Sequence, residues 1–354
     1  MKENIKVGII GGSGFTGMEL VKILSRHKYV EISFATSRTY KNLLVSEVFP
    51  SYQDNGDTKL AFTCKPKKDD LEKIDLIFLC LPPLKSMEFL KGISGNYKFK
   101  IIDVGSDFRL KSSDDYKYWY GTEHILKEKL SDFVYGLTEI NKDKIGKSKY
   151  IANPGCYPVS ILLGLAPVLK SNIKIKDINI DSKSGVSGAG RKLKDEYLFG
   201  SLDNNFYAYS AEGHRHTGEI EQEIESMSGK NFKINFTPHL LPVNRGIFTS
   251  IYCKLDGVIE EEKTEKQICS LFENFYKCSP FVKFRGKKIP QLKDVIGTNM
   301  CLIGFCLDVR TDTLKIFSVI DNLLKGAAGQ AVQNMNIMMG FDEKEGLQFN
   351  GIFS

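Results

Sequence analysis

The stretch IKVGIIGGSGFTG, residues Ile5–Gly17, joins an apolar run to a glycine-rich turn and is the strongest indication of fold class in this chain. Its first part, Ile5–Ile10, is nearly continuously apolar, which is the pattern of a parallel strand covered on both faces. The turn that follows contains the motif G-x-G-x-x-G at Gly12, Gly14 and Gly17. Glycines at these positions let the backbone turn tightly and approach a pyrophosphate, whose charge then lies at a helix N-terminus.

A helix and a second strand are predicted after this turn. Val21 and Leu24 share one helical face with Gly17, which predicts an amphipathic helix, and the next strand is predicted at Val30–Thr36. A glycine-rich turn can exist without a ligand, so the motif alone is weak. Placed between a strand and a helix, it predicts a dinucleotide-binding βαβ unit in an α/β sheet.

The end of the second strand indicates which dinucleotide binds. Enzymes that use NAD place a carboxylate there to hold the ribose 2′-hydroxyl, whereas this strand ends in Thr36, Ser37 and Arg38. A hydroxyl and a guanidinium suit a 2′-phosphate, because arginine binds phosphate in a bidentate manner. The sequence therefore predicts NADP, with Arg38 as a solvated loop residue as the alternative.

Two further strands are predicted at Ile74–Leu81 and Lys100–Gly105. Ligands of open α/β sheets gather outside the carboxyl ends of the strands. Arg109 lies just beyond such an end and is a candidate anion-binding residue. A pairing of Arg109 with the neighbouring Asp107 is an equal alternative.

The segment NPGCYP, Asn153–Pro158, precedes an apolar run at Val159–Lys170 that predicts a buried helix. Pro158 fits the first turn of a helix, where a missing N–H costs nothing. Cys156 would then lie at the helix N-terminus, where backbone N–H groups and the helix dipole stabilise a thiolate. The alternative is an ordinary turn cysteine with a small buried thiol.

A nucleophilic cysteine needs a proton partner, and His214 and His216 are the candidates, just before a helix predicted from Gly218 or Glu219. A Cys–His pair is one route to an activated thiol. The H-x-H spacing also suits zinc, with Cys156 as a third ligand, or a hydrogen-bonded loop. The spacing alone leaves these alternatives open.

Two small-residue segments complete the candidate site. The segment Lys183–Lys194 is rich in Gly and Ser, contains Gly185 and Arg191, and could present N–H groups and a positive charge to an anion. The segment Asp321–Phe341 carries helical periodicity after a run of small residues that permits close packing. The alternative for Lys183–Lys194 is a flexible connector, and the alternative for Asp321–Phe341 is an ordinary contact between helices.

Composition limits the class of protein. At 354 residues the chain fits two domains, and 42% hydrophobic with 26% charged residues is typical of a soluble globular protein. A net charge of +6 without a long basic block does not favour nucleic acid. The eight cysteines contain no C-x-x-C, which favours a reducing cytoplasm. The most apolar run, Ile74–Leu84, is too short to span a bilayer.

These motifs, in this order, closely resemble the N-acetyl-γ-glutamyl-phosphate reductase family, whose members are NADP-dependent enzymes of arginine biosynthesis. The resemblance runs from about residue 5 to 341. The looser relative, aspartate-semialdehyde dehydrogenase, has a different cysteine neighbourhood. The matching pieces are GGSGFTG, TSRTYKNLLVSEVFP, DVGSDFRL, YGLTEINK, NPGCYP, SGVSGAGRK, GHRHTGEIEQ, FTPHLLPVNRGI and DNLLKGAAGQAVQNMN.

The resemblance implies a Rossmann-type NADP-binding domain over residues 1–155, completed by a C-terminal helix over 323–354, and an α+β catalytic and dimerisation domain over 156–322. It implies Cys156 as nucleophile and His214 as general acid/base, with no metal. Cofactor contacts would be Gly12, Ser13, Gly14, Phe15, Thr16, Gly17, Ser37, Arg38, Gly185 and Asn322. Substrate contacts would be Arg109, Asn153, Arg191 and His216.

The implied reaction is reduction of N-acetylglutamyl 5-phosphate by NADPH through a Cys156 thioester, in a cytoplasmic homodimer or homotetramer. The chain departs from the family pattern at three positions. Val159 stands where Thr is common, Gly218 where Pro is common, and Pro83 where His is common. These differences affect the expected geometry of the loops and leave the reaction class unchanged. The same chemistry on an aminoadipyl phosphate, free or carrier-bound as in a lysine-pathway relative, or on a glutamyl or aspartyl phosphate is the nearest alternative. A zinc-dependent alcohol dehydrogenase and a non-catalytic NADP sensor are alternatives of other classes.

Overall fold

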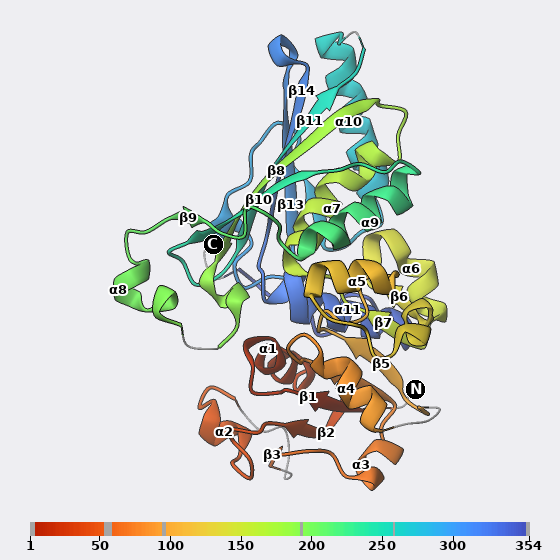
Figure 1. Cartoon of the computed structure of the whole chain (residues 1–354), viewed down its shortest axis with the longest axis vertical. Helices are drawn as coiled ribbons and strands as arrows, with labels where there is room; N and C mark the ends of the chain where they lie inside the picture. Colours follow the sequence, from red (N-terminus) through yellow and green to blue (C-terminus); the bar gives the residue numbers. More distant parts are fainter. Residues whose placement is uncertain (1–3, 53–58, 94–96, 192–193, 258, 352–354) are drawn as a thin grey trace. The chain divides into compact units, whose positions relative to one another are not determined.

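A computed structural model describes residues 4–52, 59–93, 97–191, 194–257 and 259–351 of the chain. The chain divides into two compact units (Figure 1). The first unit comprises Met1–Pro154 and Ala327–Gln348, and the second comprises Gly155–Gly326 and Phe349–Ser354. The chain therefore crosses between the units immediately before Cys156 and again after Gly326.

The first unit contains a seven-stranded sheet in the order β3-β2-β1-β4-β5-β7-β6, and all its paired strands are parallel. This confirms the predicted α/β fold with a parallel sheet. The strands are β1 (Ile5–Ile10), β2 (Val30–Thr36), β3 (Phe62–Thr63), β4 (Leu76–Leu79), β5 (Lys100–Asp103), β6 (Phe133–Tyr135) and β7 (Tyr150–Ala152). The helices are α1 (Phe15–Leu24), α2 (Val45–Val48), α3 (Lys68–Glu72), α4 (Lys85–Gly92), α5 (Ser113–Tyr120), α6 (Thr138–Lys147) and α11 (Gly329–Met338).

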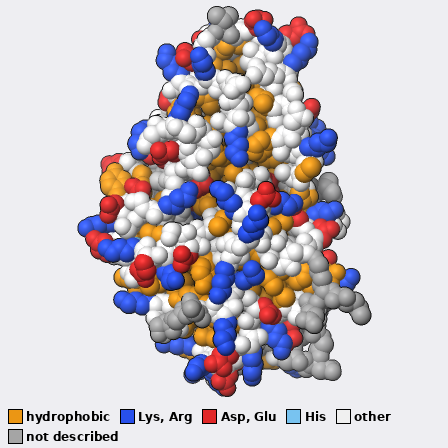
Figure 2. All heavy atoms as spheres, turned by 90° about the vertical axis from the view of Figure 1, so that its right-hand side faces the viewer, with side chains coloured by type: hydrophobic (Ala, Val, Ile, Leu, Met, Phe, Trp, Pro, Cys, Tyr) orange, Lys and Arg blue, Asp and Glu red, His pale blue; other side chains and the backbone are white. Residues whose placement is uncertain are grey.

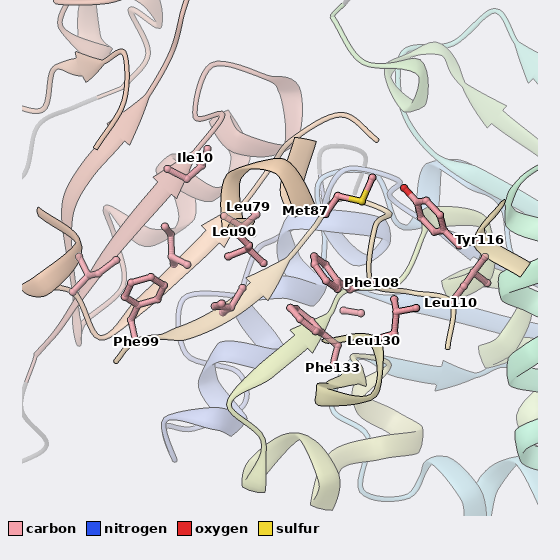
Figure 3. Packing of buried hydrophobic residues seen from close by; sticks show 14 of the residues in the cluster. Ile10, Leu79, Met87, Leu90, Phe99, Phe108, Leu110, Tyr116, Leu130 and Phe133 are labelled. Carbon is pink, nitrogen blue, oxygen red and sulfur yellow. The ribbon is translucent and has the colours of Figure 1, made fainter. Parts of the chain in front are cut away.

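An apolar cluster packs against one side of this sheet (Figure 3). Phe108, which follows β5, stacks on Phe133 of β6 with their ring centroids 4.0 Å apart. Leu79 and Leu90 bring β4 and α4 into the same cluster. Burial of each such side chain stabilises the fold by about 1.5–3 kcal/mol, so the loops at the carboxyl ends of β4 and β5 rest on a well-packed base.

Helix α11 comes from the C-terminal part of the chain and packs in the first unit against α1 and α6. Its buried Asn334 accepts a hydrogen bond from the Thr138 hydroxyl at 2.7 Å and donates to Oδ1 of Asn153 at 3.0 Å. Its Asn336 contacts Nε2 of His27 at 3.0 Å. These polar contacts fix α11 to segments that are distant in sequence. The apolar periodicity of α11 does not predict these partners, because the contacting side chains are polar.

The second unit contains a mixed sheet in the order β12-β13-β14-β11-β8-β10-β9. Figure 1 shows α7, α9 and α10 along one side of it. The strands are β8 (Ile175–Gly185), β9 (Tyr207–Ala208), β10 (Asn235–Leu241), β11 (Ile247–Leu255), β12 (Val282–Phe284), β13 (Cys301–Asp308) and β14 (Thr313–Ile320). The helices are α7 (Cys156–Leu169), α8 (Phe199–Leu202), α9 (His216–Ser228) and α10 (Glu261–Tyr276).

Helix α7 is the buried helix predicted from the apolar run after Cys156. Every residue from Tyr157 to Leu169 is buried, and the helix packs on β11 and β14. Pro158 lies in its first turn, and the helix ends at Leu169, shortly after Pro167. A helix with so little polar surface is held rigidly, which fixes the position of its first residue.

Charged side chains of both signs are interspersed over the face drawn in Figure 2. None of the helices in the described ranges combines the length and the apolar character needed to cross a bilayer.

Candidate active site

Cys156 is the first residue of α7 and is half-buried. The residue before it, Gly155, has extended backbone angles and supplies no side-chain cap to the helix. Its carbonyl accepts the first helical hydrogen bond, from the N–H of Val159 at 3.0 Å. The thiol therefore lies where the N–H groups and the dipole of a buried helix stabilise negative charge.

The Gly155 N–H has a partner from another helix. It donates to Oε1 of Glu219, in the first turn of α9, at 2.8 Å. Glu219 is buried although it carries a carboxyl group. Sequence reasoning missed this residue, because a buried glutamate and a solvated one look alike in a helical pattern.

His214 lies in the loop just before α9 and is half-buried. Its ring is surrounded by the rings of Tyr157, Tyr209, His216 and Phe236, at centroid distances of 5.6, 5.8, 4.7 and 5.7 Å. Burial, with a smaller contribution from the positive charge of Arg215, lowers the pKa of His214 to about 4. The imidazole is therefore neutral near pH 7.

A backbone contact fixes the tautomer of this neutral ring. The N–H of His216 donates to Nδ1 of His214 at 3.1 Å, so the ring proton is on Nε2. His216 itself is buried at the start of α9. Among the described residues, no three His, Cys, Asp or Glu side chains gather in a way that could hold a metal ion.

Two tyrosines that the sequence did not single out line the same region. The hydroxyls of Tyr157 and Tyr209 are 3.0 Å apart, and Tyr157 also donates to the carbonyl of His239 at 3.3 Å. Burial raises the pKa of the Tyr157 hydroxyl and raises that of Tyr209 to about 12. Both hydroxyls therefore remain protonated near neutral pH and act as hydrogen-bonding groups.

Gly326 approaches Cys156 from the other end of the second unit's sequence. A Cβ placed on Gly326 would lie 2.9 Å from Cys156 Cβ, closer than such atoms approach in proteins. The preceding residue, Lys325, is fully buried, with Nζ 5.9 Å from the centre of the Phe281 ring. The small residues of Asp321–Phe341 thus include one whose lack of a side chain leaves room for the candidate nucleophile.

Gly185 and Asn322 belong to one loop cluster of the second unit. Asn322 accepts a hydrogen bond from the N–H of Gly246 at 2.7 Å and donates to the hydroxyl of Ser187 at 2.9 Å. Gly185 donates its N–H to the carbonyl of Gly246 at 2.9 Å. The Asn322 side chain therefore organises the start of the Gly/Ser-rich segment, which also contains the exposed Arg191.

The glycine-rich turn of the first unit has the geometry that its motif predicts. The Gly12 N–H donates to the carbonyl of Thr36 at 2.9 Å, and Gly14 is the N-cap residue of α1 without a side-chain cap. A Cβ on Gly17 would lie 2.3 Å from the carbonyl oxygen of Gly11, so this position excludes any side chain. Phe15 and Thr16 are the first residues of α1.

The turn is tied to the end of β2 by two serines. The hydroxyls of Ser13 and Ser37 are 2.8 Å apart, and Ser37 also accepts the N–H of Tyr40 at 3.1 Å. Arg38 is exposed, and the described part of the chain provides no ion pair for its guanidinium. These residues fit a dinucleotide carrying a 2′-phosphate, because no side chain caps the N-terminus of α1 and an exposed cation lies at the end of β2.

Arg109 and Asn153 are brought together in the first unit. Nε of Arg109 donates to the carbonyl of Asn153 at 2.9 Å, and Nη2 donates to that of Val104 at 3.0 Å. The Asp107 carboxylate accepts the N–H groups of Leu84, Ser86 and Met87 around the start of α4, at 2.8, 3.0 and 3.1 Å. Arg109 thus supports the backbone that leads toward Cys156.

Comparison with known proteins identifies the family. Residues 6–148 match the NAD-binding domain of semialdehyde dehydrogenases, and residues 156–322 match their dimerisation domain. The N-acetyl-gamma-glutamyl-phosphate reductase of Desulfotalea psychrophila is 45% identical over 352 residues, covering 99% of both chains. That of Pelotomaculum thermopropionicum is 44% identical over 353 residues, with the same coverage of each chain. The chain belongs to the N-acetyl-γ-glutamyl-phosphate reductase family.

Membership of this reductase family confirms the predicted enzyme class, an oxidoreductase that forms an aldehyde from an acyl phosphate. It also confirms the predicted pathway, arginine biosynthesis, and NADP as the cofactor of the family. The match to a dimerisation domain supports an oligomer. The fold of the reductase is also that of aspartate semialdehyde dehydrogenase II from Vibrio cholerae. That structure aligns with a TM-score of 0.72 at 18% identity, covering 96% of this chain and 99% of that one.

Proposed function

We propose that the protein reduces N-acetylglutamyl 5-phosphate to N-acetylglutamate 5-semialdehyde and phosphate, with NADPH as reductant and Cys156 as the nucleophile. The observation that carries this proposal is the position of Cys156 as the first residue of the buried helix α7. A thiol at such a position ionises readily, and the thiolate is the nucleophilic form.

The Cys156 thiolate attacks the acyl carbonyl carbon, and the tetrahedral intermediate expels phosphate to leave a thioester on sulfur. NADPH, when bound, supplies the hydride that reduces this thioester. The resulting thiohemiacetal oxyanion collapses, releasing the aldehyde and restoring the thiolate. A covalent intermediate divides one difficult step into easier ones.

We assign the general acid/base position to His214, which suits the role of hydrogen-bond donor to the oxygen of both tetrahedral intermediates. Its neutral ring carries the proton on Nε2, because Nδ1 accepts the His216 N–H. An N–H that donates a hydrogen bond to the developing oxyanion stabilises it, and in this arrangement the proton stays on Nε2. His216 supports this function by fixing the tautomer, and we propose that it also contacts the substrate.

We assign cofactor contacts to Gly12, Ser13, Gly14, Phe15, Thr16, Gly17, Ser37 and Arg38 of the first unit and to Gly185 and Asn322 of the second. The close approaches of Gly17 and the Ser13–Ser37 contact support the first group. The preference for NADPH rests on Arg38, an exposed cation where NAD enzymes have a carboxylate.

We assign substrate contacts to Arg109, Asn153 and Arg191 in addition to His216. Arg109 is the least direct of these, since two of its donors hold backbone carbonyls. We further propose that residues 156–322 form the catalytic and dimerisation domain of a cytoplasmic homodimer or homotetramer that binds no nucleic acid.

The test is turnover in the reverse direction. Purified protein is given NADP and phosphate with either N-acetylglutamate semialdehyde or aspartate semialdehyde, and NADPH formation is followed. Preferential turnover of the acetylated substrate supports the proposal. Faster turnover of aspartate semialdehyde would favour aspartyl phosphate as the substrate, and no turnover of either aldehyde would favour the non-catalytic NADP sensor.

A further inference from the structure

One polar side chain lies in the middle of the buried helix that carries Cys156. From Pro158 to Leu169 the sequence of α7 contains a single polar side chain, Ser160, which lies one helical turn after Cys156. Ser160 is 0% exposed. Apolar contacts are non-directional, whereas a buried hydroxyl requires a partner at a defined distance and angle. Ser160 can therefore fix the position of α7 more closely than its apolar neighbours do.

The partners of Ser160 are hydroxyl groups that lie side by side on three adjacent strands of the second unit. Ser182 of β8 is paired with Thr249 of β11, Thr249 is paired with Ser318 of β14, and all three are buried. We call these three residues the hydroxyl row. Ser160 Oγ donates to the Thr249 hydroxyl at 2.9 Å and lies 3.3 Å from that of Ser318. The hydroxyls of Ser182 and Thr249 are also 2.9 Å apart, so α7 is attached at one point to three strands.

The same face of α7 lies close to the sheet along its length. Gly164 follows Ser160 by one turn, and a Cβ placed on Gly164 would lie 2.8 Å from Cδ1 of Ile251 in β11. Cys156 precedes Ser160 by one turn, and its Cβ lies against Gly326, which follows β14. Residues four apart share one face of a helix. A shift of α7 on the sheet therefore moves the Cys156 sulfur.

We propose that Ser160 is a positioning residue for Cys156. Its hydroxyl, bonded to the hydroxyl row, fixes α7 on the sheet and thereby sets where the thiol lies relative to the His214 ring. This inference rests on the proposed role of Cys156 as nucleophile. A displacement of about 1 Å can slow a chemical step about a hundredfold. The N–H groups and the dipole at the start of α7 move together with Cys156, so loss of the Ser160 contacts should displace the thiol and leave its ionisation unchanged.

Two variants remove the contact, one from each side. Ser160→Ala deletes the hydroxyl on α7, and Thr249→Val deletes its acceptor on β11 while the volume of that side chain stays nearly the same. Val168→Ala is the matched control, because Val168 is fully buried on α7 and lies about two helical turns beyond Ser160. This control removes buried apolar contacts and leaves the four hydroxyl groups in place.

The first readout is turnover in the reverse direction, with NADP, phosphate and the aldehyde that the native protein uses fastest. We expect Ser160→Ala and Thr249→Val each to lower kcat about ten- to a hundredfold and to leave the KM for NADP unchanged. The double variant should lose no more than the weaker of the two single variants, because both substitutions remove the same contact. Val168→Ala should lower the unfolding temperature and keep the native kcat.

The second readout separates the position of the thiol from its ionisation and from loosening of the fold. The alkylation of Cys156 by iodoacetamide is followed from about pH 5 to about pH 9, the range in which thiols of this kind titrate. Ser160→Ala should have the midpoint of the native protein. Cys253, which is buried in β11, should remain unlabelled in every variant if the sheet stays closed.

Three results would overturn the inference. The first is a native kcat in both single variants, or losses that multiply in the double variant. The second is a loss of kcat in Val168→Ala as large as that in Ser160→Ala. The third is a shifted alkylation midpoint or a labelled Cys253 in Ser160→Ala, because the loss of kcat would then come from altered ionisation or a loosened fold. Should Ser160→Ala fail to fold, the same readouts on Thr249→Val decide.

Failure of the proposed function has a different signature. If Cys156 is not the nucleophile, Cys156→Ser remains active. If only the Ser160 inference fails, Cys156→Ser is inactive while Ser160→Ala and Thr249→Val turn over at the native rate.

Discussion

The backbone N–H of His216 donates to Nδ1 of His214 at 3.1 Å, so the neutral imidazole presents Nε2–H. Because this is a backbone contact, it survives changes of the His216 side chain. His216→Asn should therefore reduce activity less than His214→Asn does. We expect His214→Asn to lose about a hundred- to ten-thousandfold in kcat, the usual contribution of a positioned acid–base group, with the KM for NADPH unchanged. Equal losses in the two variants would contradict the assignment of the two histidines.

Burial of His214 also predicts how stability depends on pH. Its pKa is about 4 in the folded protein and about 6.5 in an unfolded chain, so between these values the unfolded state binds more protons. The free energy of unfolding should fall as the pH is lowered from about 6.5 toward 4. Urea denaturation at pH 7, 6 and 5 measures this slope, and His214→Gln should make it shallower. Burial lowers the pKa of His27 and His124 as well, so part of the slope should remain.

Arg38 is predicted to select NADPH over NADH. Removing the guanidinium in Arg38→Ala should raise the KM for NADPH roughly ten- to a hundredfold, since one charge-assisted contact contributes about 1.5–3 kcal/mol. The KM for NADH should change little, because NADH has no 2′-phosphate. Lys41→Ala, an exposed cation three residues further on, is the control. A similar loss for both cofactors would reject Arg38 as the phosphate-binding residue.

Gly326 is predicted to be intolerant of any side chain. In Gly326→Ala the new Cβ would lie 2.9 Å from Cys156 Cβ, so either α7 or the Leu324–Ala328 turn must move. We expect a stability loss of about 1–3 kcal/mol and a greater than tenfold loss of kcat, with NADPH binding retained. Gly92→Ala in α4 is the control, because nothing lies within 4 Å of its added Cβ. Full activity in Gly326→Ala would show that this close approach is not needed to place the thiol.

Much of the fold follows from local sequence patterns. The strand, glycine turn and helix at Ile5–Leu24 are encoded by contiguous residues, as is the start of a buried helix at Cys156. The ends of helices and strands are harder to predict. Helix α9 begins at His216 rather than at Gly218 or Glu219, because the Thr217 N–H donates a hydrogen bond to the His214 carbonyl and starts the helix earlier. Strand β4 is also shorter than the apolar run that predicts it.

Long-range contacts around the site could not be predicted. The Glu219–Gly155 hydrogen bond and the Gly326–Cys156 approach join segments that only the packing of α7 brings together. The sequence predicts that Arg109 follows β5, which the structure confirms, but its contact with the Asn153 carbonyl depends on how β7 leads into Asn153. Residue type indicates which chemistry is possible, whereas the partner of each group is set by tertiary structure.

Zinc has no part in the proposed reaction. Purified protein should therefore keep its activity after dialysis against a chelator, and the metal content should be well below one zinc per chain. Stoichiometric zinc whose removal abolishes turnover would instead support the alcohol dehydrogenase alternative, with Cys156, His214 and His216 as ligands.

Selective labelling is the simplest test of the thiol itself. Iodoacetamide near pH 7 should modify Cys156 before the exposed Cys64, Cys278 and Cys306, since thiols at helix N-termini titrate roughly between 3.5 and 7.5. Loss of activity should parallel labelling, and bound acyl-phosphate substrate should protect. Slow labelling of Cys156, with the exposed thiols reacting first, would favour an ordinary turn cysteine.

A thioester on Cys156 is the intermediate that defines the proposed mechanism, and it can be trapped. Enzyme mixed with NADP and N-acetylglutamate semialdehyde in the absence of phosphate should release a burst of one NADPH per active site and then stop. Mass spectrometry should then find the acetylglutamyl group on the peptide that contains Cys156, and added phosphate should remove it. Cys156→Ser should fold and still bind NADPH, yet show neither burst nor turnover. A fully active Cys156→Ser, or a burst with the acyl group on another residue, would contradict the mechanism.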